Sequence, residues 1–253
     1  MRASTLSGVV PCTLFALTIG AVQSFLSAPG PLARHQPSST SLMESSKPNE
    51  LFDSPGWEAI RQELDQVPVF AVASAEGQPV KYRIEKKDEE SFEVPLFYTH
   101  ISDALVELEK AKENTPLPGM DINPYPLGGI FEMWANDSAI IVPNKKSMIQ
   151  AGAPPNAIPM GQQVPLFACM EIAQEDEKGT PVLPLFFELD DATNAVSQAV
   201  SVDGGKAEDL EVVGLNLSEA VSLLANSKEK STAFQFIPPA SSLKHIRDYI
   251  TGG

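Results

Sequence analysis

Cysteine is almost absent from this chain, which has two among its 253 residues, Cys12 and Cys169. Cys12 falls in an N-terminal stretch that we expect to be removed, so the mature protein can form no internal disulfide. The remaining cysteine lies inside the apolar run 167–170, a setting typical of a small buried side chain, not of a redox or catalytic thiol. Histidine is nearly as scarce, with three residues that are too far apart in sequence to suggest a zinc site.

Catalytic motifs are missing as well. The sequence contains no G-x-S-x-G, H-E-x-x-H or P-loop pattern, and residues 204–207 (GGKA) lack the first glycine and the hydroxyl residue of a P-loop. His100 and Asp103 are spaced so that they could meet on a helical turn, but no serine or cysteine has a nucleophile motif around it. We therefore expect no enzymatic activity, no small-molecule substrate, and no catalytic, cofactor-binding or metal-binding residues.

Basic residues are outnumbered. Lysine and arginine total 18 against 33 aspartate and glutamate residues, which gives a formal net charge of −15. Nucleic acids and anionic membrane surfaces require clustered positive charge, so we expect neither as a partner and at most a peripheral contact with a membrane. Cationic partners fit this charge better.

A long apolar run is also lacking. The stretch 9–22 is too short and too weakly apolar for a membrane span of about 20 residues, and it suits a secretory signal peptide over residues 1–24. Residues 25–43 contain no acid and are rich in serine, proline and alanine, which is typical of a transit peptide. The alternative is a secreted protein with a serine- and proline-rich N-terminus.

The junction between these two segments has a distinctive sequence. Residues 23–29 (QSFLSAP) resemble the cleavage motif of the two-part plastid presequence of algae with secondary, red-type plastids. That resemblance implies a plastid location reached through the endoplasmic reticulum. Asn136 and Asn216 match the N-glycosylation pattern, which matters only if the chain dwells in that compartment.

What the chain does contain is a repeated phrase of Val-Pro or Leu-Pro, an apolar residue and Phe. It occurs at 67–70 and 94–97, and again at 164–167 and 183–186. The later phrase of each pair leads into an Asp-Ala step, Asp103-Ala104 or Asp191-Ala192. Self-similarity at a spacing of this size indicates a duplicated structural unit.

The duplication predicts the domain organisation of the mature chain, residues 44–253. We expect repeat one at about 66–150 and repeat two at about 163–240, each a β-β-α-(α)-β unit of an α/β (α+β) fold. An alternating strand predicted at 80–84 has no evident counterpart in repeat two. Because units of this size bury little surface alone, we expect two pseudo-symmetric repeats packed as one compact body.

Aromatic residues are the candidates for the core or for contact with a client protein. Proline starts a strand or marks its edge, so each phrase places its Phe at the entry of a strand. Burial of one Phe is worth roughly 1.5–3 kcal/mol, so exposure of all four would remove most of a typical stability of about 5–15 kcal/mol. The candidates are Phe70, Phe97, Trp134, Phe167 and Phe186. An apolar groove could instead use Trp134 with Met148, Ile149, Ile158 and Met160.

Taken together, this pattern resembles the twenty-two-kilodalton subunit family of the chloroplast inner-envelope translocon, the Tic proteins, and its cyanobacterial relatives. The resemblance covers about residues 66–240. It is carried by the paired phrases, the two Asp-Ala steps, Pro126-Leu127 and the ending 234–239 (FQFIPP).

The resemblance implies a duplicated α/β fold and a soluble, chaperone-like factor, without a cofactor, that helps preproteins across the plastid envelope. Its partners would be preproteins and translocon subunits, in the intermembrane space or at the envelope periphery. Two alternatives stay open. One is a structural or adaptor protein that docks a translocon subunit, and the other is a non-catalytic plastid protein with a different role.

Overall fold

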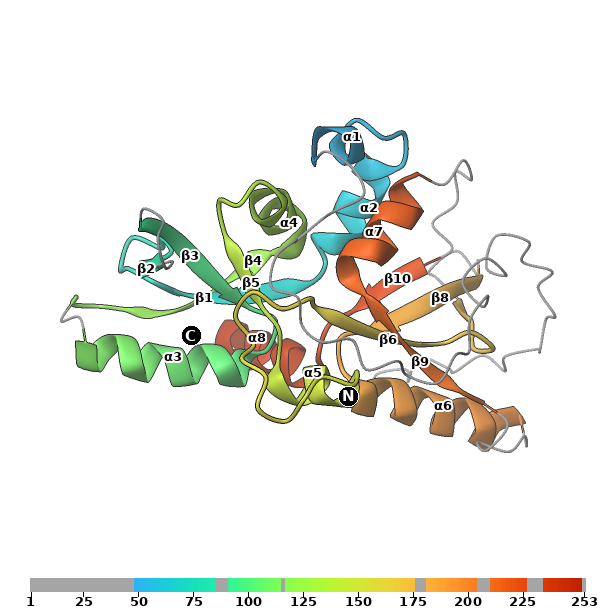
Figure 1. Ribbon diagram of the computed structural model, residues 1–253. Coiled ribbons are helices and arrows are strands. Elements are labelled where there is room, and N and C mark those ends of the chain that lie inside the picture. Colours follow the sequence, from blue (N-terminus) through green and yellow to red (C-terminus); the bar gives the residue numbers. More distant parts are fainter. Residues whose placement is uncertain are drawn as a thin grey trace, which may run out of the picture.

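The computed structural model describes residues 48–84, 91–114, 117–175, 181–203, 210–226 and 234–251. The described first half contains α1 (Pro48–Phe52), α2 (Trp57–Leu64), β1 (Pro68–Ala73), β2 (Lys81–Ile84), β3 (Phe92–Tyr98), α3 (Ile101–Asn114), β4 (Asp121–Pro126), α4 (Leu127–Ala135), β5 (Ile140–Val142) and α5 (Lys145–Gln150). The described second half contains β6 (Pro165–Cys169), β7 (Gln174–Glu175), β8 (Pro181–Phe186), α6 (Leu189–Asp203), β9 (Val212–Asn216), α7 (Leu217–Ala225), β10 (Phe234–Ile237) and α8 (Ala240–Thr251) (Figure 1). The predicted signal and transit segments lie outside the described residues.

The two halves build sheets of the same topology. In the first, β1 pairs antiparallel with β3 and β4, β2 pairs antiparallel with β3, and β5 pairs parallel with β3. In the second, β6 pairs antiparallel with β8 and β9, β7 pairs antiparallel with β8, and β10 pairs parallel with β8. Strands β1 to β5 therefore correspond in order to β6 to β10, and the predicted mixed α/β class is confirmed.

The predicted order of elements within a repeat was incomplete. Each half runs through three strands and then alternates helix and strand, so β4, β9 and α5 were missing from the predicted β-β-α-(α)-β unit. The spacing of Leu243, Ile246 and Ile250 does predict the helix α8, which the structure makes the last element of the second repeat. The prediction that β2 has no counterpart in the second repeat was also wrong. The two-residue strand β7 occupies the corresponding place in the second sheet. The sequence of β4, DINPYP, is typical of a loop, but an outer strand tolerates proline because one of its edges needs no hydrogen bonds.

The first phrase of each repeat plays the same structural role. The carbonyl of Val67 accepts the N–H of Leu127 at 2.9 Å, and the carbonyl of Val164 accepts the N–H of Leu217 at 2.9 Å. Each Val-Pro step thus begins a central strand. Its valine also accepts a hydrogen bond from the first residue of the helix that covers the sheet, α4 or α7.

The second phrases are displaced by one residue relative to each other. Phe70 lies opposite Tyr98 in the first sheet, whereas Phe167 lies opposite Phe186 in the second. The counterpart of Phe186 is therefore Tyr98, not Phe97 as the repeated phrase suggested. Because side chains alternate across a strand, Phe97 and Phe186 point to opposite faces of their sheets.

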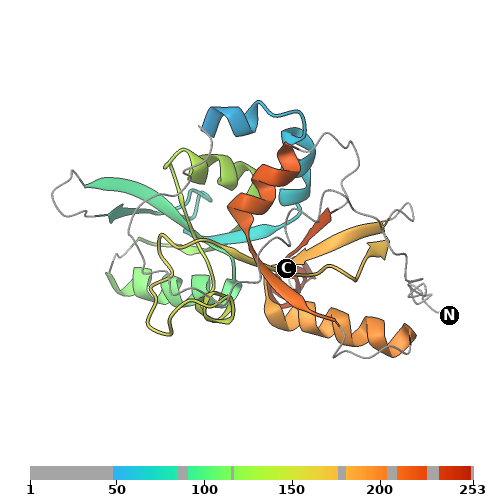
Figure 2. The same ribbon diagram turned by 45° about the vertical axis from the view of Figure 1, so that its right-hand side comes forward.

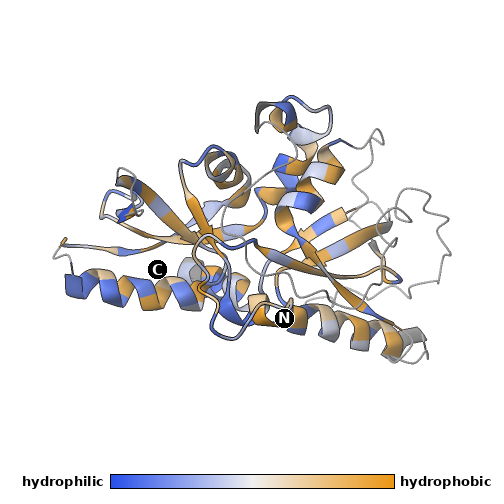
Figure 3. Ribbon diagram, in the orientation of Figure 1, coloured by the Kyte–Doolittle hydropathy of each residue, from blue (hydrophilic) through white to orange (hydrophobic). Residues whose placement is uncertain are grey.

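Helices cover both faces of the sheets and leave one core that both repeats share. In Figures 1 and 2, α2, α4 and α7 lie on one side of the strands, and α3 and α6 lie on the other. Beneath the first group, buried side chains of both halves form one cluster, including Val69, Leu127, Leu166, Leu217 and Phe236. Separate clusters lie beneath α3 and α6. The strands are mostly hydrophobic in Figure 3, whereas α3 carries many hydrophilic residues.

Helix α2 lies outside the repeats and connects them. The N–H of Gly56, which precedes α2, donates to the carbonyl of Ala225 at the end of α7 at 3.0 Å. On its other side, Trp57 of α2 contacts Phe131 of α4, with ring centroids 5.8 Å apart. The backbones also approach closely at Gly128 of α4, where an added Cβ would lie 2.7 Å from the carbonyl oxygen of Arg61. This helix therefore packs on α4 and α7 at once.

Candidate functional site

The structure places all of the aromatic candidates in the interior. Their exposed fractions are 0 % for Phe70, 1 % for Phe97, 6 % for Trp134, 2 % for Phe167 and 6 % for Phe186. Phe97 and Trp134 belong to the shared core, whereas the other three lie in the clusters beneath α3 and α6. A client bound to the folded protein therefore does not reach these rings.

The other groove candidates divide between core and surface. Met148 is buried, whereas Ile149, Ile158 and Met160 are exposed. The three exposed side chains lie in or just before the segment 151–164 that connects the two repeats. Backbone hydrogen bonds hold this connection, among them Ala157 N–H to the carbonyl of Pro154 and Gln162 N–H to the carbonyl of Pro159. It offers apolar side chains to solvent from a hydrogen-bonded chain of turns.

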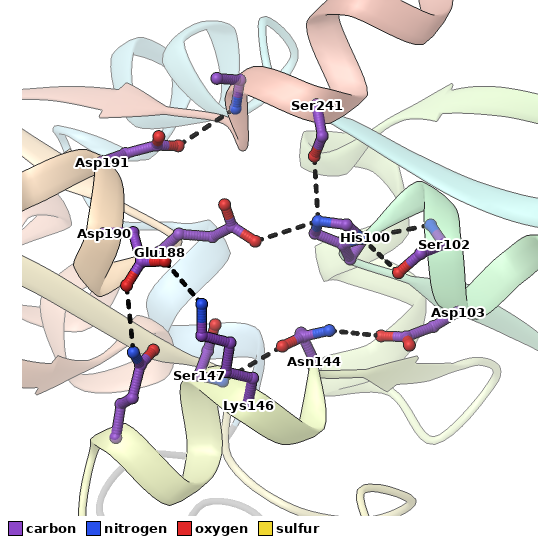
Figure 4. A network of polar contacts seen from close by, with 12 residues as sticks. His100, Ser102, Asp103, Asn144, Lys146, Ser147, Glu188, Asp190, Asp191 and Ser241 are labelled. Carbon is purple, nitrogen blue, oxygen red and sulfur yellow. Dashed lines mark hydrogen bonds and ion pairs between the residues drawn. The ribbon is translucent and has the colours of Figure 1, made fainter.

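A polar junction forms where the N-termini of α3 and α6 meet (Figure 4). His100 precedes α3 and Glu188 precedes α6, so the two residues occupy corresponding positions of the two repeats. His100 Nε2 lies 3.0 Å from Glu188 Oε1, with 14 % and 23 % of the two side chains exposed. Ser241 Oγ in α8 lies 2.9 Å from the same nitrogen. We call His100, Glu188 and Ser241 the junction triad.

The two Asp-Ala steps flank this junction and hold the final helix of each repeat. Asp103 accepts a hydrogen bond from the side chain of Asn144 at 2.9 Å, and Asn144 in turn caps α5 by accepting the N–H of Ser147 at 3.1 Å. In the second repeat, Asp191 accepts the backbone N–H of Ala240, the first residue of α8, at 3.1 Å. Both carboxylates thus anchor the start of a helix, one through an intermediate side chain and one directly.

Each final helix also reaches the opposite repeat. Lys146 and Gln150 of α5 both donate to the carboxylate of Asp190 in α6. In the other direction, α8 packs against α3, and the ring of His245 lies 6.1 Å from that of Phe70, centroid to centroid. The repeats are therefore joined by an exchange of helices as well as by a common core.

Charges at the junction shift several pKa values. The hydrogen bond to Glu188 raises the pKa of His100; burial opposes this shift, and the carboxylates of Glu188, Asp103 and Asp191 support it. Burial raises the pKa of Asp191. The hydrogen bond from Lys146 lowers the pKa of Asp190. The pKa of His100 is therefore higher in the folded protein than in the unfolded chain, chiefly through its contact with the other repeat.

Ser102, His100 and Glu188 form a hydrogen-bonded chain that superficially matches a hydrolase triad. Ser102 Oγ lies 2.7 Å from His100 Nδ1. The backbone N–H of Ser102 donates to the same nitrogen at 3.1 Å, which is how a side chain caps the first turn of a helix. Both hydrogen bonds from Ser102 therefore end on one nitrogen of His100 and fix the orientation of its ring at the start of α3.

Two clefts of ≈370 Å³ lie at corresponding places in the repeats. The β4 cleft is lined by Asp65, Gln66, Pro68, Pro124, Tyr125, Pro126, Leu243 and Ile246. The β9 cleft is lined by Ala151, Gly214, Leu215, Asn216, Glu219 and Ala220. Each runs along an outer strand and is completed from the opposite repeat, the β4 cleft by α8 and the β9 cleft by the residue that follows α5.

Metal and membrane sites are not apparent in the part of the chain that the structure describes. Its histidine, cysteine and carboxylate side chains form no group of three or more that could hold a metal ion. None of its helices combines the length and the apolar character that crossing a bilayer requires.

The comparison with known proteins rests on structure. No family model and no curated protein sequence matches the chain. Among solved structures, Tic22 from Plasmodium falciparum matches with a TM-score of 0.62 and 16 % identity, over 77 % of this chain and 98 % of that one. Anabaena Tic22, described as a protein of protein transport, matches with a TM-score of 0.58 and 16 % identity, over 76 % and 96 %. The chain therefore has the fold of Tic22.

Proposed function

We propose that this protein is a non-catalytic, chaperone-like factor that assists the import of preproteins into a plastid. The observation that carries the proposal is the fold: it matches Tic22 from two organisms over about three quarters of this chain, and one of the two is described as a protein of protein transport. The plastid-type presequence predicted from residues 23–29 supports the same organelle.

The surface supports transient contact with unfolded polypeptide. Ile158 is 72 % exposed and belongs to the connection between the repeats, with Ile149 and Met160 close to it in sequence. Isolated exposed apolar side chains are common, but three within twelve residues form a candidate contact for apolar client segments. The net charge of −15 favours basic clients.

Suppression of client aggregation tests this function. The purified protein, at an equimolar ratio, is expected to reduce the light scattering of a chemically unfolded client after dilution. Ile158→Ser is expected to weaken suppression without lowering the melting temperature, because the side chain it replaces is largely in solvent. Tyr249→Ser, which removes an exposed apolar side chain from α8, is the matched control and should leave suppression unchanged. No suppression by the unaltered protein would contradict the proposal.

The adaptor role is the second candidate, and the helix exchange between repeats favours it because a rigid body suits permanent docking. It predicts one stoichiometric translocon subunit after crosslinking in intact plastids, with no preprotein captured. Capture of several preproteins during import would support the chaperone-like role instead. We also propose that the protein acts in the envelope intermembrane space or at its periphery, which fractionation of the same plastids tests.

A further inference from the structure

The two corresponding outer strands, β4 and β9, differ in one chemical respect. In β4 the residues at the end next to α4 are Pro124, Tyr125 and Pro126, and in β9 their counterparts are Gly214, Leu215 and Asn216. The backbone at the last of these positions is nearly the same, with φ −70° and ψ 131° for Pro126 and φ −101° and ψ 137° for Asn216. The strands therefore match in shape and differ in which residues carry an N–H.

The direction of each backbone N–H follows from the ladder. Leu127 donates to Val67 and Leu217 donates to Val164, so both of these residues turn their N–H groups toward the central strand. In an antiparallel pair every second residue does the same, and the residues between them turn their N–H and C=O groups outward. Next to α4 and α7 the outward positions are therefore 124 and 126 in β4, and 214 and 216 in β9. Residues 122 and 212 continue the two rows at the far ends of the strands.

Proline occupies both of these outward positions in β4. Since proline has no N–H, another strand cannot pair with this part of the edge, and proline at an outer strand is a known protection against unwanted pairing. At the same positions of β9, Gly214 and Asn216 keep their N–H groups. Gly214 is exposed, and a Cβ added to it would meet nothing within 4 Å. The β9 edge thus offers an accessible donor–acceptor row beside a cleft.

The chemistry of this edge selects its occupant. Alternating N–H and C=O groups at strand spacing are complementary to another extended backbone. Glu219 is the charged residue among those that line the β9 cleft, and Glu211 directly precedes the strand. A second copy of this chain would bring the same acidic groups and a charge of −15 to the contact, which opposes pairing of identical edges. A basic segment has the complementary charge.

We propose that the β9 edge binds an extended, basic polypeptide segment by β-strand addition, and that proline closes the corresponding edge of β4. The inference builds on the proposed function, since the segment would belong to a client protein. It assigns different roles to the two repeats, with one binding edge on β9 and one closed edge on β4.

Proline substitution on β9 tests the proposal. The probe is a fluorescent peptide of about ten residues with alternating valine and lysine, a length typical of a strand. Gly214→Pro is expected to weaken its binding by about tenfold or more, because one donor is lost and the ring obstructs the approach. Gly214→Val keeps the N–H, fits the open space and should bind within about twofold of the unaltered protein. Equal binding by all three proteins overturns the proposal.

Further arms of the same experiment identify the occupant. A peptide with glutamate in place of lysine should bind more weakly, and added salt should weaken the lysine peptide. If Gly214→Pro does not fold, Asn216→Pro replaces it, because the corresponding position of β4 holds Pro126 in a similar extended backbone. A dimer that Gly214→Pro converts to a monomer would show that a second copy occupies the edge and would overturn the proposal.

Failure of this inference can be told apart from failure of the proposed function. If the unaltered protein suppresses client aggregation while Gly214→Pro binds the peptide normally, the inference fails and the function stands. If the unaltered protein suppresses nothing yet loses the peptide on Gly214→Pro, the edge site stands and the chaperone-like role fails.

Discussion

Two neighbouring glycines in α4, Gly128 and Gly129, test how closely α4 packs against α2. A Cβ added to Gly128 would lie 2.4 Å from Asp65 Oδ1 and 2.7 Å from the carbonyl oxygen of Arg61. The carboxylate can move aside, but the carbonyl belongs to the backbone of α2 and cannot move unless the helices separate. A Cβ added to Gly129 would meet nothing within 4 Å. The same substitution at adjacent positions should therefore change stability in opposite directions.

The magnitudes follow from these distances. Gly128→Ala is expected to destabilise the fold by about 1–3 kcal/mol, the usual cost of overpacking, even after the gain in helix propensity. Gly129→Ala should stabilise it by about 0.5–1 kcal/mol through that propensity alone. In a protein of this size, 1 kcal/mol corresponds to about 2–4 °C in melting temperature.

Thermal and urea unfolding of the two variants measure these changes. Gly128→Ala should melt at least about 2 °C below the unaltered protein, and Gly129→Ala should melt slightly above it. Equal melting temperatures for the two variants would refute the close contact of α2 with α4. A double variant should show the sum of the separate effects if Gly129 acts through its own helix only.

Three further predictions concern single side chains. His100→Asn keeps a capping side chain but removes the contact with Glu188, which raises the pKa of His100. The stabilisation from this contact is complete below the ordinary histidine pKa of about 6.5, and it is lost as pH rises through the raised pKa of the folded protein. The difference in unfolding free energy between the unaltered protein and this variant should therefore shrink from pH 6 to pH 8, and a difference that grows would contradict this assignment. Burial, and then the hydrogen bond to Glu171, raise the pKa of the Cys169 thiol to about 11, so it should react with a thiol reagent roughly 100-fold more slowly in the folded than in the urea-unfolded protein. Phe167→Ala should lower the unfolding free energy by about 3–5 kcal/mol, since the ring is buried beneath the second sheet; a loss below 1 kcal/mol would show that the ring is not a core element.

The Val-Pro steps made the central strands predictable, because proline fixes where a strand can begin. Val67 and Val164 mark the entries of β1 and β6, and both receive the helix that follows the fourth strand. The fourth strands themselves could not be predicted by the same logic. Pro124 and Pro126 are the signature of a loop until the neighbouring strand is known, and Gly214 weakens the signal of β9 in the same way.

Matching the repeated phrases did not predict which residues of β3 and β8 correspond. The phrase ending in Phe97 resembles the phrase ending in Phe186, yet the sheets align Phe186 with Tyr98. What the fold preserves is the face on which a large side chain lies, and a displacement of one residue exchanges the faces. The two Asp-Ala steps agree with the observed alignment, because Asp103 follows Tyr98 by the same number of residues as Asp191 follows Phe186. The aspartates therefore predict the alignment of the repeats better than the phrases do.

The junction triad was missed because its members are far apart in the chain. His100 drew attention through its spacing to Asp103, whereas the structure joins it to Glu188 of the other repeat. A signal was available: aligning the two Asp-Ala steps places His100 and Glu188 at the same position. A basic and an acidic residue at equivalent positions then predict a contact wherever the repeats face each other.

The exchange of final helices has a consequence for how such a molecule can be divided. A fragment that ends before β6 would keep α5 without the carboxylate of Asp190 and would lose the ring of His245 from above Phe70. Each half therefore depends on contacts that the other half supplies. We therefore expect the two repeats to unfold as one cooperative unit, and we expect neither half of the chain to fold alone.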